Sequence, residues 1–313
     1  MGRGEVAGDL LTATITGREA AAVRRPATRR RGGATPWLFL LAPLLLLALF
    51  TYVPVVSMFF YSVTDWDGLS PRQEFVGTEN YEQIVSRAEL VDVLGVSLYY
   101  FGAAFVQLAL ALYFATVLSF RVRFANLFKG IIFFPYLING VAIGFVFLYF
   151  FRPEGTLDAL LSVTGLDGHP WLGDPDTVNY SLAGVSVWRY LGLNFVLFLG
   201  AIQSISPHLY EAAELDGANR WQQFRHIILP SIRNIVGLTA ILAIAGSLSV
   251  FEIPYIMTGG ANGSKTFVIQ TIDLAFKFGK VGLASAMAVV LLVLILLVTW
   301  VQRRLVPEDE VRA

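Results

Sequence analysis

Long apolar blocks, separated by short polar segments, make up most of this 313-residue chain. Blocks of about 20 residues match the ~30 Å hydrocarbon core of a bilayer, because a helix rises about 1.5 Å per residue. The pattern predicts an all-α, polytopic membrane protein with six transmembrane helices. The predicted spans are Pro36–Tyr61, Val91–Phe120, Ile131–Phe151, Tyr180–Ile205, Asn234–Thr258 and Ala284–Gln302.

Lysine and arginine residues are divided unequally between the two sides of these spans. If the N-terminus is cytoplasmic, segments 1–35, 121–130, 206–233 and 303–313 are cytoplasmic too, and they hold 16 of the 23 Lys and Arg residues. The outer segments hold six, and Arg189 lies within a span. Because cytoplasmic loops are enriched in Lys and Arg, the bias predicts that both termini lie in the cytoplasm.

The same pattern predicts the organisation of the chain. Residues 1–35, rich in Ala, Gly, Thr and Arg, are expected to form a disordered, basic cytoplasmic tail, with a twin-arginine export signal as the alternative. The next apolar block is too long for a signal-peptide core, and no cleavage pattern follows it. We expect the first transmembrane helix and an outer loop over 36–90, five further transmembrane helices over 91–303, and a cytoplasmic tail over 304–313.

The three outer loops are predicted to differ in structure. The second, 152–179, is rich in Gly and Pro and is expected to be irregular. The third, 259–283, contains apolar residues between Thr266 and Phe278 that predict a short helix lying at the membrane surface.

Composition excludes several classes of protein. With 56% hydrophobic and 15% charged residues and a mean hydropathy of +0.63, the chain is no ordinary soluble domain. The absence of cysteine excludes a disulfide framework and a thiol nucleophile, and no HExxH or GxSxG motif is present. The segment Gly259–Thr266 superficially resembles a phosphate-binding loop, but Ser264 stands where that motif requires glycine before lysine. The sequence therefore predicts neither an enzyme nor a metal or cofactor site.

A polar segment between the fourth and fifth spans is predicted to be a helix–turn–helix. Ser206 is placed to cap a helix that Pro207 begins, and Gly217 suits the left-handed turn that ends it. Asn219 and Gln222 have the spacing of a capping box for the second helix, which Pro230 is expected to close. The apolar stripe of this helix consists of Trp221, Phe224, Ile227 and Ile228.

The role of this segment has two possible interpretations. Polar loops between membrane helices are usually connectors. Here, however, specific caps, an apolar stripe and a cytoplasmic position favour a surface on which a soluble partner docks.

The spacing within this segment resembles a known motif. Glu-Ala-Ala, three residues, Gly, nine residues, Ile, one residue and Leu-Pro occupy Glu211 to Pro230 without a gap. This spacing resembles the EAA motif of the membrane subunits of binding-protein-dependent ABC importers. The fuller form, EAAELDGANRWQQFRHIILP, resembles the carbohydrate branch, which includes permeases of maltose, glycerol-phosphate and oligosaccharide type. The resemblance covers roughly residues 36–303 and includes Phe133–Tyr136, Trp188, Phe251–Tyr255, Thr258–Gly260 and Gly282–Ala286.

The resemblance implies a multi-pass permease subunit in a bacterial plasma membrane. It implies a second related permease subunit in a heterodimer, a dimeric ATPase that binds ATP and Mg²⁺, and an extracellular solute-binding protein or lipoprotein. It implies no nucleic-acid partner and no cofactor bound by this chain. In that family the segment is a coupling helix seated on the ATPase, and the expected coupling residues are Glu211, Ala212, Ala213, Asp216 and Gly217.

A path for sugars requires hydroxyl-binding side chains and aromatic faces, and polar residues within membrane spans are costly enough to suggest function. Polar candidates from the third to fifth spans, together with positions implied by the maltose permease, are Tyr136, Asn139, Gly140, Ser186, Arg189, Tyr190, Leu193, Asn194, Ser247, Val250, Glu252 and Tyr255. Each polar residue could instead form interhelical hydrogen bonds. Arg189 and Glu252 could pair with each other or with a neighbouring subunit.

The sequence leaves several substrates and functional classes open. A disaccharide or oligosaccharide is the expected substrate, while Arg189 keeps a glycerol phosphate ester open because a phosphate requires a cation. A self-sufficient secondary transporter is the second class, although only Glu252 is a plausible intramembrane acid and no internal repeat is visible. A scaffold protein without any path is the third class.

Overall fold

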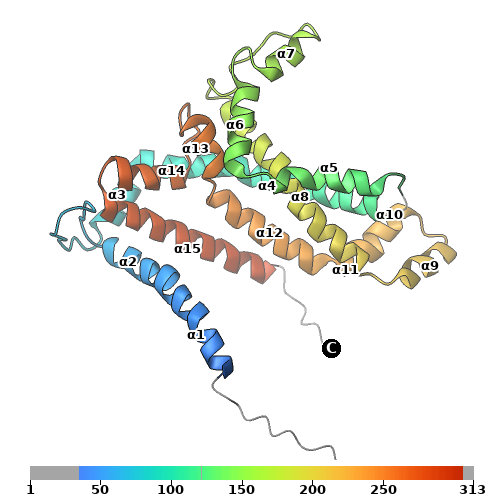
Figure 1. The fold of residues 1–313 in the computed structure, drawn as a ribbon, viewed down its shortest axis with the longest axis horizontal. Helices are drawn as coiled ribbons and strands as arrows, with labels where there is room; N and C mark the ends of the chain where they lie inside the picture. Colours follow the sequence, from blue (N-terminus) through green and yellow to red (C-terminus); the bar gives the residue numbers. More distant parts are fainter. Residues whose placement is uncertain (1–34, 121, 306–313) are drawn as a thin grey trace, which may run out of the picture. The chain divides into compact units, whose positions relative to one another are not determined.

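The computed structural model describes residues 35–120 and 122–305. The predicted tails fall outside these ranges, apart from Thr35 and the last residues of the C-terminal helix. All regular elements in the described ranges are helical, in agreement with the predicted fold class, and the isolated bridge between Thr64 and Phe75 is the one strand-like pairing among them (Figure 1). The chain divides into two units, Met1–Val53 and Pro54–Ala313.

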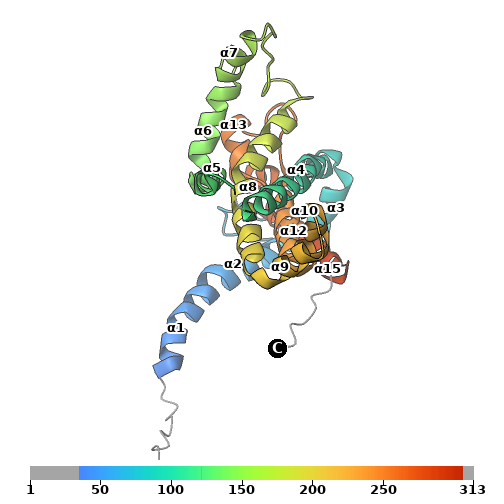
Figure 2. The ribbon, with the colours of Figure 1, turned by 90° about the vertical axis from the view of Figure 1, so that its right-hand side faces the viewer.

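The first unit contains α1 (Thr35–Leu47) and a π-helical turn, η1 (Ala48–Tyr52). Its side chains from Trp37 onward are exposed and mostly apolar. Figure 2 shows this helix in blue. The helical path continues through α2 (Val53–Tyr61), which gives a candidate membrane span over Trp37–Tyr61 with none of its residues buried. A helix that is apolar all round suits a lipid environment.

The second unit contains four more helices long and apolar enough to cross a membrane. These candidate spans are α4 (Ala88–Ser119), α8 (Val178–Gln203), α12 (Arg233–Leu248) with α13 (Glu252–Thr258), and α15 (Val281–Leu305). The described residues therefore hold five candidate spans, or six if one bent pair of helices counts as a span. The six predicted spans are matched on that second count.

The predicted third span, Ile131–Phe151, is not one continuous helix. The chain instead forms α5 (Ala125–Leu137) and α6 (Gly140–Phe151), which meet at 98°. Pro135 lies in the last turn of α5, and Ile138 and Asn139 adopt extended ψ angles of 136°. Asn139 then caps α6, because its side chain accepts a hydrogen bond of 2.9 Å from the Val141 N–H.

The spans pack around α4 and α8. Apolar residues of these two helices and of the segment after α10 form one buried cluster: Ala111, Ala115, Leu118, Phe195, Phe198, Leu199, Ile202, Ile228 and Ile232. Gly192 on α8 allows α5 to approach closely, because a Cβ there would lie 2.6 Å from the Ile132 carbonyl oxygen. A second cluster, which includes Tyr100, Ile143 and Ile253, joins α4, α6, α8 and α13.

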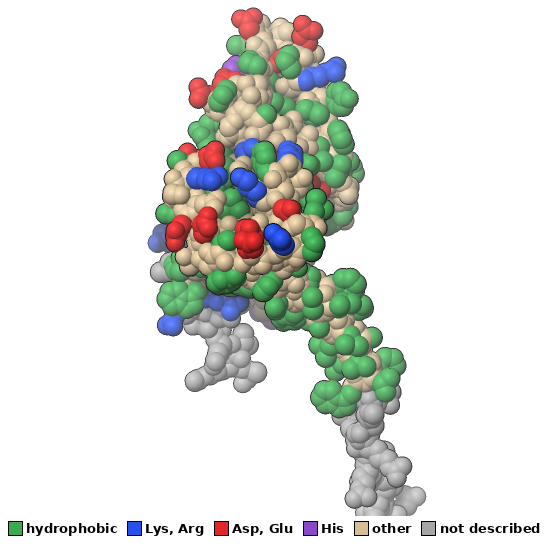
Figure 3. All heavy atoms as spheres, turned by 90° about the vertical axis from the view of Figure 1, so that its left-hand side faces the viewer, with side chains coloured by type: hydrophobic (Ala, Val, Ile, Leu, Met, Phe, Trp, Pro, Cys, Tyr) green, Lys and Arg blue, Asp and Glu red, His purple; other side chains and the backbone are tan. Residues whose placement is uncertain are grey.

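The three loops predicted to lie on the outer side contain more structure than expected. The first carries α3 (Glu79–Ser86), and the second, expected to be irregular, contains α7 (Thr156–Ser162). Exposed charged side chains of α3 and of the loop before it gather on the face shown in Figure 3. The third contains α14 (Phe267–Ile272) and η3 (Asp273–Lys277).

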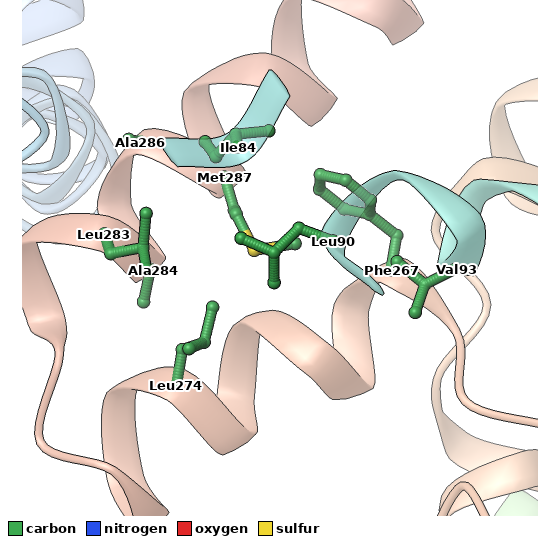
Figure 4. Close-up of a cluster of buried hydrophobic side chains, with 9 residues drawn as sticks. All are labelled: Ile84, Leu90, Val93, Phe267, Leu274, Leu283, Ala284, Ala286 and Met287. Carbon is green, nitrogen blue, oxygen red and sulfur yellow. The ribbon is translucent and has the colours of Figure 1, made fainter. Parts of the chain in front are cut away.

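The apolar face of α14 and η3 is buried in the protein rather than laid only on a membrane surface. Phe267 and Leu274 pack with Ile84 of α3, Leu90 of α4 and Met287 of α15 in a third buried cluster (Figure 4). The predicted short helix is therefore confirmed in its location along the chain, and the structure adds that its apolar face packs within the protein.

Candidate functional site

The segment between α8 and α12 begins with α9 (Pro207–Leu215), which ends in a complete Schellman motif. Gly217 has a φ of +79°, the left-handed conformation that glycine adopts most readily. The Ala218 N–H donates to the Ala213 carbonyl at 2.8 Å, and the Gly217 N–H donates to the Glu214 carbonyl at 3.1 Å. The predicted turn is confirmed, with Pro207 at the start of the helix.

The second helix of this segment, α10 (Arg220–Gln223), begins with the predicted capping box. The Gln222 N–H donates to the Asn219 side chain at 3.0 Å, and the Asn219 N–H donates to the Gln222 side chain at 2.8 Å. Two expectations fail. Ser206 makes no side-chain cap, and Pro230 does not close the helix, since the chain continues as η2 (Phe224–Ile228) and α11 (Leu229–Ser231). A proline is tolerated there because it occupies the first turn of α11.

The five expected coupling residues lie on the solvent-exposed surface of this segment. Glu211, Ala212, Asp216 and Gly217 are exposed, and Ala213 is half-buried. The Glu211 carboxylate lies 3.2 Å from the His208 ring. Large apolar side chains are exposed beside them: Leu209 at 52%, Leu215 at 90% and Trp221 at 66%. Exposed apolar groups next to a specified turn are typical of a docking surface.

A groove of about 670 Å³ lies between this segment and the adjoining ends of α4 and α8. Glu211 and Glu214 from α9 and Arg220 from α10 supply its charged groups. The Arg220 guanidinium lies 5.0 Å from the centre of the Phe120 ring, which joins α10 to the end of α4. Burial raises the pKa of Tyr210, which also lines the groove.

A second cavity, of about 400 Å³, lies between α4, α8, α12 and the start of α13. Its volume falls within the roughly 300–1,000 Å³ range of small-molecule pockets. Figure 1 shows α9 and α10 toward one end of α12 and α13 toward the other. Seven of the expected path residues line the cavity: Ser186, Tyr190, Leu193, Asn194, Ser247, Val250 and Glu252.

The hydroxyls and amide of this cavity are partly used by their own helices. Ser186 donates to the Leu182 carbonyl at 3.3 Å, and Ser247 donates to the Ile244 carbonyl at 2.7 Å. The Asn194 amide donates to the Tyr190 carbonyl at 3.4 Å. The acceptor oxygens of these groups remain for a ligand, because each hydroxyl or amide oxygen has two lone pairs.

Arg189 and Glu252 form an ion pair at the edge of the cavity. Arg189 Nη1 lies 2.6 Å from Glu252 Oε2, and the arginine side chain is only 13% exposed. The guanidinium also lies 5.1 Å from the centre of the Tyr190 ring. The pairing of these two residues, open at the level of sequence, therefore occurs within the chain.

The other expected path residues do not line the cavity. Tyr136 stands with its ring 6.4 Å from that of Tyr190, and Asn139 caps α6. A Cβ on Gly140 would overlap both the Glu252 carboxylate and the Arg189 guanidinium. Tyr255 stacks on Phe251 with ring centres 4.8 Å apart.

The sequence missed the contribution of α4 to the cavity. Tyr100 and Gln107 line it, together with Ala103 and Ala104, at the spacing of one helix face. The Tyr100 hydroxyl is buried and has no hydrogen-bond partner among the described residues. Two polar residues seven positions apart in an apolar span were a readable signal.

The described part of the chain contains no group of three or more His, Asp or Glu side chains arranged to hold a metal ion. The charged groups of the groove and the cavity are few and dispersed. The chemistry available at both places is therefore recognition by hydrogen bonds, aromatic faces and isolated charges.

The chain is similar to known membrane transport proteins. Residues 107–308 match the family described as "Binding-protein-dependent transport system inner membrane component". The chain is 34% identical to the probable ABC transporter permease protein YurN of Bacillus subtilis, over 86% of this chain and 94% of the relative. It is 29% identical to the multiple sugar-binding transport system permease protein MsmF of Streptococcus mutans, over 88% and 96%.

A solved structure supports the fold. A chain in the crystal structure of a bacterial alginate ABC transporter, in complex with an alginate pentasaccharide-bound periplasmic protein, matches with a TM-score of 0.77. The match covers 86% of this chain and 93% of that chain at 19% identity. Because the family match covers more than half of the sequence, this chain belongs to the inner membrane components of binding-protein-dependent transport systems, which are ABC transporter permeases.

Proposed function

We propose that this chain is one of two related permease subunits of an ATP-driven importer for a neutral disaccharide or oligosaccharide. The cavity between α4, α8, α12 and α13 forms part of the sugar path. The observation that carries this proposal is the lining of that cavity, in which Tyr100, Gln107, Tyr190 and Asn194 offer hydroxyl, amide and aromatic groups. Such groups recognise sugars without requiring a charge on the ligand.

The relatives support the class of substrate. MsmF is described as a permease of a multiple sugar-binding transport system. We extend this description to the present chain because the cavity is lined mainly by neutral polar and apolar groups. The remaining path residues, Tyr136, Asn139, Gly140, Arg189 and Tyr255, are proposed to support the wall around Tyr190 and Glu252.

The segment from Pro207 to Gln223 is proposed to couple the path to a separate ATPase dimer, which binds ATP and Mg²⁺. Its two helices are fixed by a Schellman motif and a capping box, and the apolar side chains of Leu215 and Trp221 are exposed. A docking surface requires both a defined backbone and apolar area to bury. Glu211, Ala212, Ala213, Asp216 and Gly217 are the proposed contacts.

The proposed assembly contains a second permease, the ATPase dimer and an extracellular solute-binding protein. A binding protein is present in the alginate transporter complex, which has the same fold. We propose a bacterial plasma membrane location with both termini in the cytoplasm, a basic tail over 1–35 and a short tail over 304–313. The first helix and outer loop over 36–90 then precede the five-helix core over 91–303, and the family match at 107–308 largely coincides with that core.

The ion pair between Arg189 and Glu252 argues against two alternative functions, transport of a glycerol phosphate ester and secondary transport. Arg189 was the argument for a glycerol phosphate ester, and it is already neutralised by Glu252 at 2.6 Å. Glu252 was the one candidate for an ion-coupling acid of a secondary transporter, and its carboxylate is engaged in the same ion pair. A scaffold protein without a path has no use for a polar cavity among its spans.

Uptake by cells tests the proposal. A strain lacking the gene should lose uptake of at least one labelled sugar from a panel of neutral di- and trisaccharides, and the gene should restore it. Restoration should require ATP and should fail with Gly217→Val, which strains the proposed coupling turn. Unchanged uptake of every sugar in the deletion strain would contradict the proposed substrate class.

A further inference from the structure

The wall of the 400 Å³ cavity carries a single formal charge. Among the described residues that line it, Glu252 is the one acid and no Lys, Arg or His lines it. The remaining lining groups are hydroxyls, amides, aromatic rings and aliphatic side chains. The Glu252 side chain is 39% exposed, so a ligand in the cavity can reach its carboxylate.

A compensating cation lies next to this carboxylate and away from the cavity surface. Arg189 contacts Oε2 of Glu252 through Nη1, while its own side chain is only 13% exposed. Its Nε is buried and has no hydrogen-bond partner among the described residues. A guanidinium with an unused donor binds a second planar anion readily once its present partner is removed.

The pair is also fixed in place. Gly140, at the start of α6, leaves just enough room for both charged groups, because a Cβ there would overlap each of them. The guanidinium lies over the Tyr190 ring. Contacts from three helices, α6, α8 and α13, therefore fix the position of the Glu252 carboxylate next to the Arg189 guanidinium.

We propose that Glu252 selects substrates by charge, admitting neutral sugars and excluding acidic ones, and that Arg189 becomes an acid-binding site when Glu252 is neutralised. This inference rests on the proposed function. A neutral sugar hydroxyl donates to the carboxylate, whose Oε1 takes no part in the ion pair. A uronate in the cavity would lie closer to the Glu252 carboxylate than to the Arg189 guanidinium, which does not line the cavity, so repulsion by the nearer charge outweighs attraction by the farther one. Glu252→Gln preserves the shape and uncovers the cation.

The test measures direct binding, so that the specificity of a separate binding protein does not enter. The transporter complex is purified through a tag on this chain, without the binding protein, and titrated by saturation-transfer-difference NMR. The probes are glucose trisaccharides with α-1,4, β-1,4 and α-1,6 linkages. Each probe is paired with its C6-carboxylate and its 6-amino-6-deoxy counterparts, which differ only in charge and in the group at C6.

The expected result is a reversal of charge preference. Wild-type complex should bind a neutral trisaccharide about tenfold more tightly than its carboxylate, which corresponds to roughly 1.4 kcal/mol. Glu252→Gln should bind the carboxylate at least as tightly as the neutral sugar. Arg189→Gln should instead favour the amino sugar, because it leaves the Glu252 carboxylate without its cation.

The double variant Arg189→Gln/Glu252→Gln is the matched control, because it removes both charges, with an isosteric change at Glu252 and a shorter polar side chain at Arg189. It should bind neutral sugar more weakly than wild type, because the carboxylate acceptor is lost, and it should favour neither charged form. If Glu252→Gln does not assemble, Arg189→Gln still decides whether Glu252 sets the charge preference, and Glu252→Ala decides whether Arg189 binds an acid.

Two contrary results are distinguishable. If the variants bind neutral sugar with unchanged charge preference, Glu252 does not select by charge, and the sugar path stands. If wild-type complex binds none of the sugars, the cavity is not a sugar site, and both the path and this inference are overturned.

Discussion

Gly140 on α6 lies so close to Glu252 on α13 that a Cβ on the glycine would overlap the carboxylate. Gly140→Ala is therefore expected to push the ion pair away from the break between α5 and α6. Overpacking of this kind lowers the free energy of unfolding by about 1–3 kcal/mol. Thermal unfolding of the purified complex and initial rates of sugar uptake should both decrease.

Gly184→Ala is the matched control for this change. Gly184 lies on α8, and a Cβ there would have no atom within 4 Å. It should leave the unfolding temperature and uptake close to wild type. If Gly140→Ala and Gly184→Ala have equal unfolding temperatures and uptake rates, the cavity wall accommodates a methyl group at Gly140.

The left-handed turn at Gly217 should be required for coupling rather than for insertion into the membrane. Gly217→Val places a β-branched residue at a φ of +79°, which costs about 1–2 kcal/mol and disrupts the Schellman motif. We expect normal amounts of protein in the membrane and loss of ATP hydrolysis stimulated by the loaded binding protein. Gly217→Asn, which tolerates this conformation, should keep most of the stimulation.

Glu211→Lys examines the charge on the same surface, because the Glu211 side chain is 68% exposed and its replacement leaves the turn intact. It should also abolish stimulated hydrolysis and transport while the protein stays in the membrane. Full stimulation in both Glu211→Lys and Gly217→Val would refute the coupling role of the segment.

Tyr190 and Asn194 should contribute to the apparent affinity for sugar. A hydrogen bond is worth about 0.5–1.5 kcal/mol, so each alanine variant should raise the KM of uptake roughly two- to tenfold. Tyr113→Ala on α4 is a suitable control, because that ring is 61% exposed and does not line the cavity. Wild-type KM values in both Tyr190→Ala and Asn194→Ala would remove these residues from the path.

Tyr100→Phe should separate stability from binding. The Tyr100 hydroxyl is buried at the cavity without a hydrogen-bond partner among the described residues. Because an unsatisfied buried hydroxyl is unfavourable, its removal should leave the unfolding temperature unchanged or slightly higher. If the hydroxyl binds sugar, the KM of uptake should rise at the same time. An unchanged KM would indicate that the hydroxyl has no ligand.

Asp273 should make stability depend on pH. Lys277 Nζ lies 2.6 Å from Oδ1 and Lys265 Nζ lies 3.3 Å from Oδ2 of this buried carboxylate. Burial raises the pKa of Asp273, and hydrogen bonds and charge from the two lysines outweigh burial, so its pKa lies below the ordinary value of 3.8. Because this pKa is lowered in the folded state, the stabilisation is present above the unfolded pKa of about 3.9 and lost as pH falls through the folded value.

The unfolding temperature of wild-type complex should therefore decrease steeply below about pH 4. Asp273→Asn should be less stable at pH 7 and show a shallower decrease toward pH 3. Asp167→Asn, at an exposed position in the second outer loop, serves as the control. Parallel pH profiles for wild type and Asp273→Asn would contradict the assigned ion pairs.

Much of the local structure could be predicted from the sequence. Gly217 and the pair Asn219 and Gln222 act through contacts within a few residues, so their turn and capping box follow from residue type and spacing. The long apolar blocks behave similarly, because bilayer thickness sets their length. The break in the third span was also readable, since Pro135 is followed by Asn139-Gly140, a common turn signal. The prediction of a single span followed the hydropathy of the block instead of this turn signal.

The cavity and its wall could not be predicted in the same way. Tyr100 comes from α4 and Ser247 from α12, and nothing in a single sequence sets the register between two apolar helices. Likewise Arg189 and Glu252 are 63 residues apart, and their pairing depends on how α8 and α13 meet. The same holds for Phe267, whose burial depends on α3, α4 and α15.

The break between α5 and α6 places a helix N-terminus next to the Arg189–Glu252 pair. The first turn of a helix presents N–H groups without helical partners and a partial charge of about +0.5. Asn139 accepts from one of these groups, and the Glu252 carboxylate packs against Gly140 in the same turn. Glu252 is itself the first residue of α13, so its carboxylate lies near the N-termini of two helices. The backbone thus contributes with Arg189 to stabilising that negative charge, and an unbroken third helix would remove the contribution of α6.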